Sequence, residues 1–225
     1  MFEIIKDKIK DKKLIIFGEL HGTKEIPKLI SEFFLEIAKE DDFNVCLEIP
    51  SEFQEEISKF LISGDKNKLE NISFFSNKYN RDGRNSAEYM NLIKTIYFIN
   101  KTYKKNIQIF CVDPNANTQN KKERGIAENI TKILDTEKTF AVLGDVHASK
   151  KRLSFGKTDI LPAGFILFNK LSNKMFSIRI LPKKGEFFNL GLKKVFNNKS
   201  QGSFNEGFDY ILEIENVSPC SFLDK

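Results

Sequence analysis

The sequence has no tryptophan, only two histidines and three cysteines in 225 residues. Cys46, Cys111 and Cys220 form an odd number without the close pair spacing of a disulfide framework or a thiolate metal site. The first two lie inside apolar runs, where cysteine behaves as a small hydrophobic residue. We therefore expect reduced thiols with no cofactor attached to them.

Long apolar stretches are also missing. No window approaches the roughly 20 consecutive apolar residues that a membrane-spanning helix needs. The first residues, MFEIIKDKIKDKK, lack the apolar segment and small-residue cleavage site of a secretion signal. We expect no membrane span and a cytoplasmic location.

Charge of one sign is not concentrated anywhere. The net charge is +5, and the densest basic pairs, Lys183-Lys184 and Lys193-Lys194, lie near the end of the chain. A nucleic-acid interface normally shows a strong basic patch, so we expect no nucleic-acid partner. Composition leaves the oligomeric state open.

Hydrophobic residues make up 40% of the chain and charged residues 30%, which is typical of a globular protein. At this length one large domain is expected over residues 1–225. Its core is predicted over about residues 13–152, followed by a β-rich extension over about 153–225.

Four short apolar runs each end in a carboxylate. They are LIIFGE ending at Glu19, FNVCLE at Glu48, IQIFCVD at Asp113 and FAVLGD at Asp145. Nearly unbroken runs rich in Ile, Val and Phe are typical of parallel strands that are covered on both faces. The sequence therefore predicts an α/β fold with a mostly parallel sheet flanked by helices.

Helical periodicity fills the segments between these runs. Apolar residues recur at three- and four-residue spacing after Thr23, after Ser51, after Ser86 and around Ile126. We expect Thr23 to cap the first of these helices, a capping box of Ser51 and Gln54 to open the second, and Asn85 or Ser86 to cap the third.

The last third of the chain has a different pattern. GFILFN, MFSIRIL and YILEIE are strand-like pieces separated by turn-rich stretches. With little helical pattern between most of them, we expect antiparallel strands added to the edge of the sheet.

The two histidines occur in matching settings. FGELHGT, residues 17–23, and LGDVHAS, residues 143–149, share a glycine, an acid, an apolar residue and a histidine in the same order. Ligands bind beyond the carboxyl ends of the strands in an open parallel sheet. We therefore expect His21 and His147 to meet there with the four strand-end carboxylates, and Gly18 and Gly144 to let the chain turn tightly.

These residues resemble a known superfamily. GELHGT, the acid in LEIP, the helix signature ERGIAENI and GDVHASK are similar to the erythromycin esterase, haem-uptake ChaN and Tiki/TraB superfamily. The resemblance covers about residues 13–152. It implies an α/β fold, and its members include esterases, metalloproteases and a haem-binding protein. The site residues that it implies are Glu19, His21, Glu48, Arg124 and His147.

Hydrolysis of an ester or amide bond in a small molecule or peptide is the first functional interpretation. In one version His21, His147 and Glu19 or Glu48 bind one divalent ion (Zn, Mn or Fe) that activates water. In the other version His21 is the general base, a glutamate orients its ring, and His147 acts as acid or hydrogen-bond donor. Arg124 would stabilise the oxyanion in both versions. No serine or threonine has the context of a covalent nucleophile.

Haem or iron binding is the alternative, with His21, His147, Tyr79 or Tyr89 as iron ligand. A two-metal phosphoesterase, indicated only by Gly144-Asp145-x-His147, would need more histidines than the chain has.

The long polar segment from Leu61 to Asn85 is a second region of interest, either as a binding loop or as disordered chain. Its Arg84, with Asp113 and Asp145 at the strand ends, is expected to bind substrate.

Overall fold

A computed structural model describes residues 2–76, 81–134, 137–155, 158–195 and 201–223. The six strands of its main sheet lie in the order β10-β7-β1-β4-β2-β3, and all of them pair in parallel. Their bounds are β1 Leu14–Glu19, β2 Phe43–Pro50, β3 Ile109–Asp113, β4 Lys138–Gly144, β7 Met175–Pro182 and β10 Tyr210–Ile214. The predicted parallel α/β fold is confirmed.

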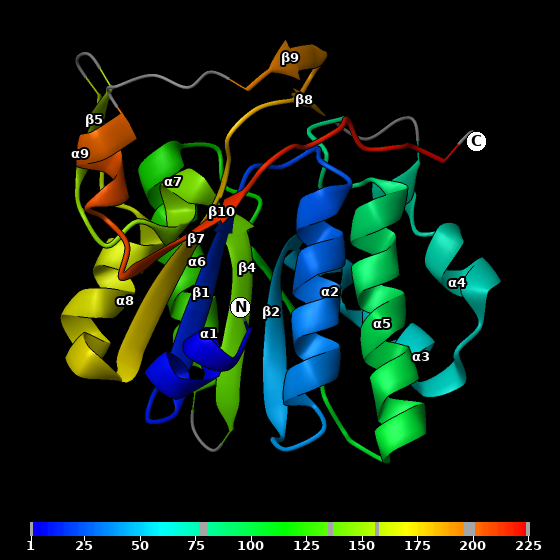
Figure 1. Cartoon of the computed structure of the whole chain (residues 1–225). Coiled ribbons are helices and arrows are strands. Elements are labelled where there is room, and N and C mark those ends of the chain that lie inside the picture. Colours follow the sequence, from blue (N-terminus) through cyan, green and yellow to red (C-terminus); the bar gives the residue numbers. More distant parts are fainter. Residues whose placement is uncertain (1, 77–80, 135–136, 156–157, 196–200, 224–225) are drawn as a thin grey trace.

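Helices cover both faces of the sheet (Figure 1). One face carries α1 (Phe2–Ile9), α2 (Glu25–Ile37), α3 (Gln54–Ser63) and α5 (Ala87–Tyr103). The other face carries α6 (Gln119–Thr131) and α8 (Ala163–Leu171). No helix of the described residues is long and apolar enough to cross a membrane.

Alternate residues of the central strands face the two layers. In β1, Ile15 and Phe17 belong to the hydrophobic cluster beneath α2 and α5, whereas Leu14 and Ile16 belong to the cluster beneath α6 and α8. This two-sided burial is why the strand sequence is apolar at every position. Phe17 and Phe140, on neighbouring strands, stack at 6.2 Å between ring centroids.

The remaining elements are short. They comprise α4 (Lys66–Glu70), α7 (Asp145–Ala148), α9 (Gln201–Asn205), the 3-10 turns η1 (Ser51–Phe53), η2 (Ser73–Phe75) and η3 (Ser172–Lys174), and two antiparallel pairs. The pairs are β5 (Leu153–Phe155) with β6 (Thr158–Ile160), and β8 (Glu186–Phe188) with β9 (Leu192–Lys194). Antiparallel pairing in the last third of the chain is thus confirmed, but it occurs in separate hairpins and in other segments than those predicted.

The details of the last third differ from the prediction. GFILFN is part of helix α8. Pro162 occupies the cap position before this helix, and the continuous apolar run of the helix packs against α6 and the sheet. MFSIRIL and YILEIE are strands β7 and β10, as expected, but each pairs in parallel with its neighbour. The hairpin strands β8 and β9, which follow β7, lie beyond the carboxyl end of the sheet, and β10 runs in the same direction as β7 (Figure 1).

Two of the expected helix caps are wrong. Thr23 forms a β-bridge with Pro219, and Lys24 occupies the cap position of α2 without a side-chain bond. Gln54 does not complete a capping box: its amide instead bonds to the Ile109 carbonyl at 2.8 Å and to the Cys111 amide at 2.7 Å. The Gln54 side chain thereby satisfies the backbone carbonyl of Ile109 and the backbone amide of Cys111 on the unpaired edge of β3.

The third cap is confirmed. Ser86 accepts a hydrogen bond from the Tyr89 amide at 3.1 Å at the start of α5. The long connection before it contains α4 and η2, so this part of Leu61–Asn85 is ordered structure. The three cysteines are buried and unpaired.

Candidate functional site

A cavity of about 400 Å³ lies beyond the carboxyl ends of β1, β2 and β4. Its lining contains both histidines together with acids, cations and three apolar residues. The lining residues are Glu19, Leu20, His21, Glu48, Asp82, Arg84, Lys122, Gly144, Asp145, Val146, His147, Asn189 and Leu190.

The first histidine is held by the acid that ends its own strand. Nδ1 of His21 and Oε1 of Glu19 are 2.8 Å apart. Glu19 is 2% exposed, so its negative charge is held out of water next to the ring. The pairing fixes the proton on Nδ1 and directs Nε2 towards the cavity.

The second histidine is held by a helix residue. Nδ1 of His147 lies 2.8 Å from Oε1 of Glu123 on α6, a side chain that is fully buried. The other oxygen of Glu123 accepts a hydrogen bond from the Ala163 amide at 2.8 Å. His147 therefore presents Nε2 to the cavity, just as His21 does.

Glu48, at the end of β2, lies between the two imidazoles. Its Oε2 is 3.4 Å from Nε2 of His21, and its Oε1 is 3.2 Å from Nε2 of His147. Oε2 also accepts a hydrogen bond from the Gly144 amide at 2.8 Å. One buried carboxylate thus faces the reactive nitrogen of both histidines.

Two further cations contact the same carboxylate. Nζ of Lys122 is 2.9 Å from Oε1 of Glu48 and 3.0 Å from Asp113. A guanidinium nitrogen of Arg84 lies 3.0 Å from Glu48 and 2.8 Å from Asp113. Asp82 holds the rest of the Arg84 guanidinium, so the donors of this arginine are committed to protein carboxylates.

These contacts shift the protonation of the site. Burial disfavours the charged form of His21, but the charges and hydrogen bonds of Glu19 and Glu48 outweigh it and raise its pKa to about 10. The same balance, with Glu48 and Glu123 as partners, raises the pKa of His147 to about 9. Burial opposes ionisation of Glu48, yet His147 and Arg84 hold its pKa well below the usual range.

Asp145 lies at one side of the cavity. Its Oδ2 accepts a hydrogen bond from Arg179 on β7 at 2.9 Å, whereas its buried Oδ1 has no hydrogen-bond partner among the described residues. Burial raises the pKa of this carboxyl more than Arg179 lowers it.

Glycine at position 144 is required for space. A Cβ there would lie 2.8 Å from Nε2 of His21. The backbone of Gly144 has φ −58° and ψ 150°, and Gly18 lies within β1, so neither uses the left-handed conformation that a tight turn would demand. Gly22 does use the left-handed conformation, with φ +82°. A Cβ at this position would lie 1.8 Å from the Phe188 carbonyl oxygen, so the turn after His21 requires glycine.

Of the expected metal ligands, Glu48 faces Nε2 of both histidines, whereas Glu19 pairs with Nδ1 of His21. Glu19 binds the Nδ1 side of His21, whereas His147 lies beyond the Nε2 side, and a carboxylate oxygen occupies each ring nitrogen. Among the described residues, no group of three or more His, Cys, Asp or Glu side chains is arranged to hold a metal ion.

The two histidines are also expected iron ligands, and both line the cavity. Both histidines are paired with carboxylates, and Tyr89 is buried in the core outside the cavity lining. Tyr79 lies outside the described residues. The cavity lining contains no aromatic side chain among the residues that the structure describes.

The structure brings together most of the expected site residues, but not Arg124. Glu19, His21, Glu48, Arg84, Asp145 and His147 line the cavity, and Asp113 contacts two of its cations. Arg124 is exposed and does not line it. Residues two positions apart on a helix face roughly opposite sides, so Lys122 points into the cavity and Arg124 points away.

Sequence reasoning missed Asp82, Lys122 and Glu123. Glu123 could have been found, because it lies three residues before Ile126 and four before Ala127, on the buried face of α6. An acid on an apolar helix face needs a buried partner. The chain is therefore an α/β protein with two histidines held by carboxylates at the end of its sheet.

Known structures share this fold. A crystal structure of a Bacillus cereus protein matches with a TM-score of 0.76 at 12% identity, over 99% of this chain and 93% of that chain. A mutant of the erythromycin esterase EreC in its open conformation matches with a TM-score of 0.66 at 11% identity, over 86% and 78%. ChaN of Campylobacter jejuni, in a structure with cofacial haem binding, matches with a TM-score of 0.50 at 15% identity, over 87% and 92%.

At these identities the likeness shows the fold. The resemblance to erythromycin esterase and ChaN expected from the histidine elements is confirmed at this level. No protein-family model matches the chain, and no curated protein gives a significant sequence match.

Proposed function

We propose that the protein hydrolyses an ester or amide bond in a small molecule or peptide, using water activated by its histidine–glutamate pairs. The observation that carries this proposal is the arrangement of His21 and His147, each held at Nδ1 by a glutamate, with both Nε2 atoms facing Glu48. A carboxylate that fixes the Nδ1 proton of a histidine is the arrangement that makes Nε2 a general base.

The two imidazoles have different roles: one is the general base and the other is the general acid. One ring must first release its proton, and the pKa values of about 10 for His21 and about 9 for His147 place that step in the alkaline range. The neutral imidazole then takes a proton from water at Nε2, and the hydroxide attacks the carbonyl carbon of the substrate. The glutamate on Nδ1 stabilises the imidazolium that forms. The other imidazole, still protonated, donates from Nε2 to the carbonyl oxygen or to the leaving alcohol or amine. Collapse of the tetrahedral intermediate breaks the ester or amide bond. The first ring then loses the proton it gained, and the second regains the proton it gave up, by exchange with water.

Charge at the site supports this chemistry. Lys122 lies beside the two imidazoles, and its charge favours the negative oxygen that develops during attack. Arg84 holds Glu48 and Asp113 in place, because its donors are already committed to carboxylates. Lys122 thus takes the role that the family resemblance assigned to Arg124.

Turnover of p-nitrophenyl esters and peptide p-nitroanilides tests the proposal. Replacing either histidine, as His21→Gln or His147→Gln, is expected to lower kcat/KM by roughly 100-fold or more, the usual contribution of a general acid or base. Circular dichroism checks that each variant is folded. Unchanged turnover in both histidine variants would contradict the proposal.

Metal analysis and haem titration separate the competing chemistries. We expect protein purified without chelator to contain no stoichiometric metal, and EDTA to leave turnover unchanged. A metal that is lost in both histidine variants would contradict the metal-free mechanism. Haem binding, the chemistry seen with ChaN, would give a Soret band without turnover.

A further inference from the structure

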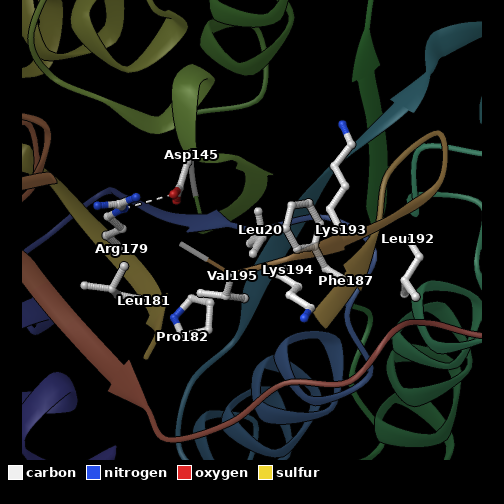
Figure 2. A pocket seen from close by; sticks show the side chains of 10 residues that line it. All are labelled: Leu20, Asp145, Arg179, Leu181, Pro182, Phe187, Leu192, Lys193, Lys194 and Val195. Carbon is white, nitrogen blue, oxygen red and sulfur yellow. Dashed lines mark hydrogen bonds and ion pairs between the residues drawn. The ribbon is translucent and has the colours of Figure 1, made fainter. Parts of the chain in front are cut away.

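A second cavity of about 490 Å³ adjoins the catalytic one. Leu20 and Asp145, both drawn in Figure 2, line both cavities, so the two cavities share a wall. A volume of this size is typical of sites that bind small organic ligands. We call it the side cavity.

Apolar side chains dominate the side cavity. In Figure 2, Leu20, Leu181, Pro182 and Val195 gather around it, and Phe187 contributes an aromatic ring. Leu181 and Phe187 belong to neither hydrophobic cluster of the core. Their apolar surface is therefore left facing the cavity, where a ligand can cover it.

Two lysines on β9 add positive charge to this apolar lining. Lys193 and Lys194, on β9, line the side cavity and form no ion pair with any described residue. The third cation, Arg179, is already paired with Asp145. The charges that remain for a ligand are those of the two lysines, so the cavity is complementary to an apolar group that carries a negative charge.

The β8–β9 hairpin links the two cavities. Asn189 and Leu190, at its turn, line the catalytic cavity, whereas Phe187 and Leu192 line the side cavity. Leu190 is 70% exposed and Leu192 is 60% exposed, which leaves apolar surface at the mouth of both. A ligand that extends from one cavity to the other would cover this surface.

We propose that the side cavity binds the acyl group of a fatty-acyl ester or amide with an anionic substituent, while the scissile bond lies beside Glu48. The apolar chain covers Leu181 and Phe187, and the negative charge lies near β9, whose Lys193 and Lys194 extend to opposite sides of the strand (Figure 2). This inference rests on the hydrolase proposed above and names its class of substrate.

Binding is tested without turnover by titrating sodium decanoate in a calorimeter. Decanoate has an apolar chain and one negative charge, and no bond to cleave. Its carboxylate can lie at the β9 lysines with the chain in the side cavity, so it reports on this cavity alone. The His21→Gln/His147→Gln variant is expected to bind it as the wild type does. Leu181→Asn and Phe187→Ala are each expected to weaken binding roughly tenfold, through lost apolar contact. Wild-type affinity in both cavity variants would overturn the proposal.

A charge-matched pair of variants tests the lysines. Lys193→Glu/Lys194→Glu is expected to weaken decanoate binding roughly fivefold at low salt, and high salt is expected to reduce the difference from wild type. The control, Lys170→Glu/Lys174→Glu, makes the same change in net charge at the opposite end of the sheet, where both lysines are exposed. Equal weakening in the two double variants would overturn the assignment of the charge to β9.

Turnover of a series of p-nitrophenyl esters, from acetate through butyrate to octanoate, completes the test. We expect kcat/KM to rise roughly fourfold for each methylene that is buried, and the rise to flatten in Leu181→Asn. Decanoate binding without turnover of any ester would support the side cavity and contradict the hydrolase. Turnover that is independent of chain length, with no decanoate binding, would overturn the side cavity and leave the hydrolase standing.

Discussion

Glu19, the last residue of β1, is the register partner of Gly144, the last residue of β4. The strands are neighbours, so the two histidine-bearing turns leave the sheet side by side. This explains how matching sequence elements so far apart in the chain come to share one carboxylate. Glu48 arrives from β2, on the other side of β4.

Glu48→Gln is expected to lower the free energy of unfolding by about 3 kcal/mol, because removing one partner leaves buried cations uncompensated. Glu48 is 1% exposed and contacts two imidazoles, Arg84 and Lys122. Urea denaturation measures the change. The control is Glu55→Gln, which removes an exposed helix-surface pair with Lys59 and is expected to have no measurable effect. Equal stability of the two variants would contradict the central role of Glu48.

Proton NMR can follow both imidazoles directly, because the chain has only two histidines. Their pKa values are expected near about 10 for His21 and about 9 for His147, with the single variants giving the assignment. Glu123→Gln removes one of the two carboxylates at His147 and is expected to lower that pKa while His21 changes little. A midpoint near about 6.5 for both rings in the wild type would contradict the ion-paired site.

Stability is expected to fall as pH rises from about 6.5 to about 10. The unfolded chain releases its histidine protons near about pH 6.5, whereas the folded chain keeps them until the raised pKa values, so the folded state binds more protons within this window. The stabilisation from the charged histidines is fully present below their pKa in the unfolded chain. It is lost as pH rises to their folded-state pKa values, about 9 for His147 and about 10 for His21. Urea denaturation across the window measures the slope.

The double variant His21→Gln/His147→Gln serves as the control for this pH dependence. It removes both titrating rings and is expected to flatten the slope. A slope equal to that of the wild type would assign the loss of stability to other groups.

Lys122→Ala and Arg124→Ala are a matched pair on one helix. We expect the lysine variant to lower kcat/KM roughly tenfold or more, because its ammonium group faces Glu48 and the developing oxyanion. The arginine variant is expected to leave kcat/KM unchanged, because that side chain is exposed and outside the cavity. Ester turnover measures both, and the reverse order would restore the role that the family resemblance gives to Arg124.

The central sheet was predictable from the sequence for a physical reason. Strands such as LIIFGE and FAVLG are buried on both faces, so they appear as short unbroken apolar runs. Their carboxyl ends carry Glu19 and Asp145, and parallel strands place such residues along one edge of the sheet. That geometry is sufficient to predict that the two histidines meet.

The last third was harder to predict because a short apolar run does not distinguish a buried strand from a buried helix. Phe165 to Phe168 is such a run, and it lies in α8. The direction of β10 depends on a connection made of a hairpin and a five-residue helix, which carries none of the long helical periodicity that normally marks a parallel crossover.

The site residues also differ in how well the sequence predicts them. Those at strand ends could be placed from the sequence, whereas Lys122 and Glu123 lie within a polar helix, and only its rotation decides which side chains enter the cavity. Arg124 was expected in the site because the family signature names an arginine there. Arg124 directly follows the buried Glu123 on α6, and the rotation of the helix turns Arg124 away from the cavity.

The position of β4 between β1 and β2 has a consequence for biosynthesis. The amino-terminal strand and Glu48 leave the ribosome well before residues 138–147 exist, and domains begin to fold from the amino terminus during synthesis. β1 pairs with β4 and β7, so it has no native strand partner until β4 is made. A chain interrupted before His147 can contain Glu19, His21 and Glu48 and still lack a working centre.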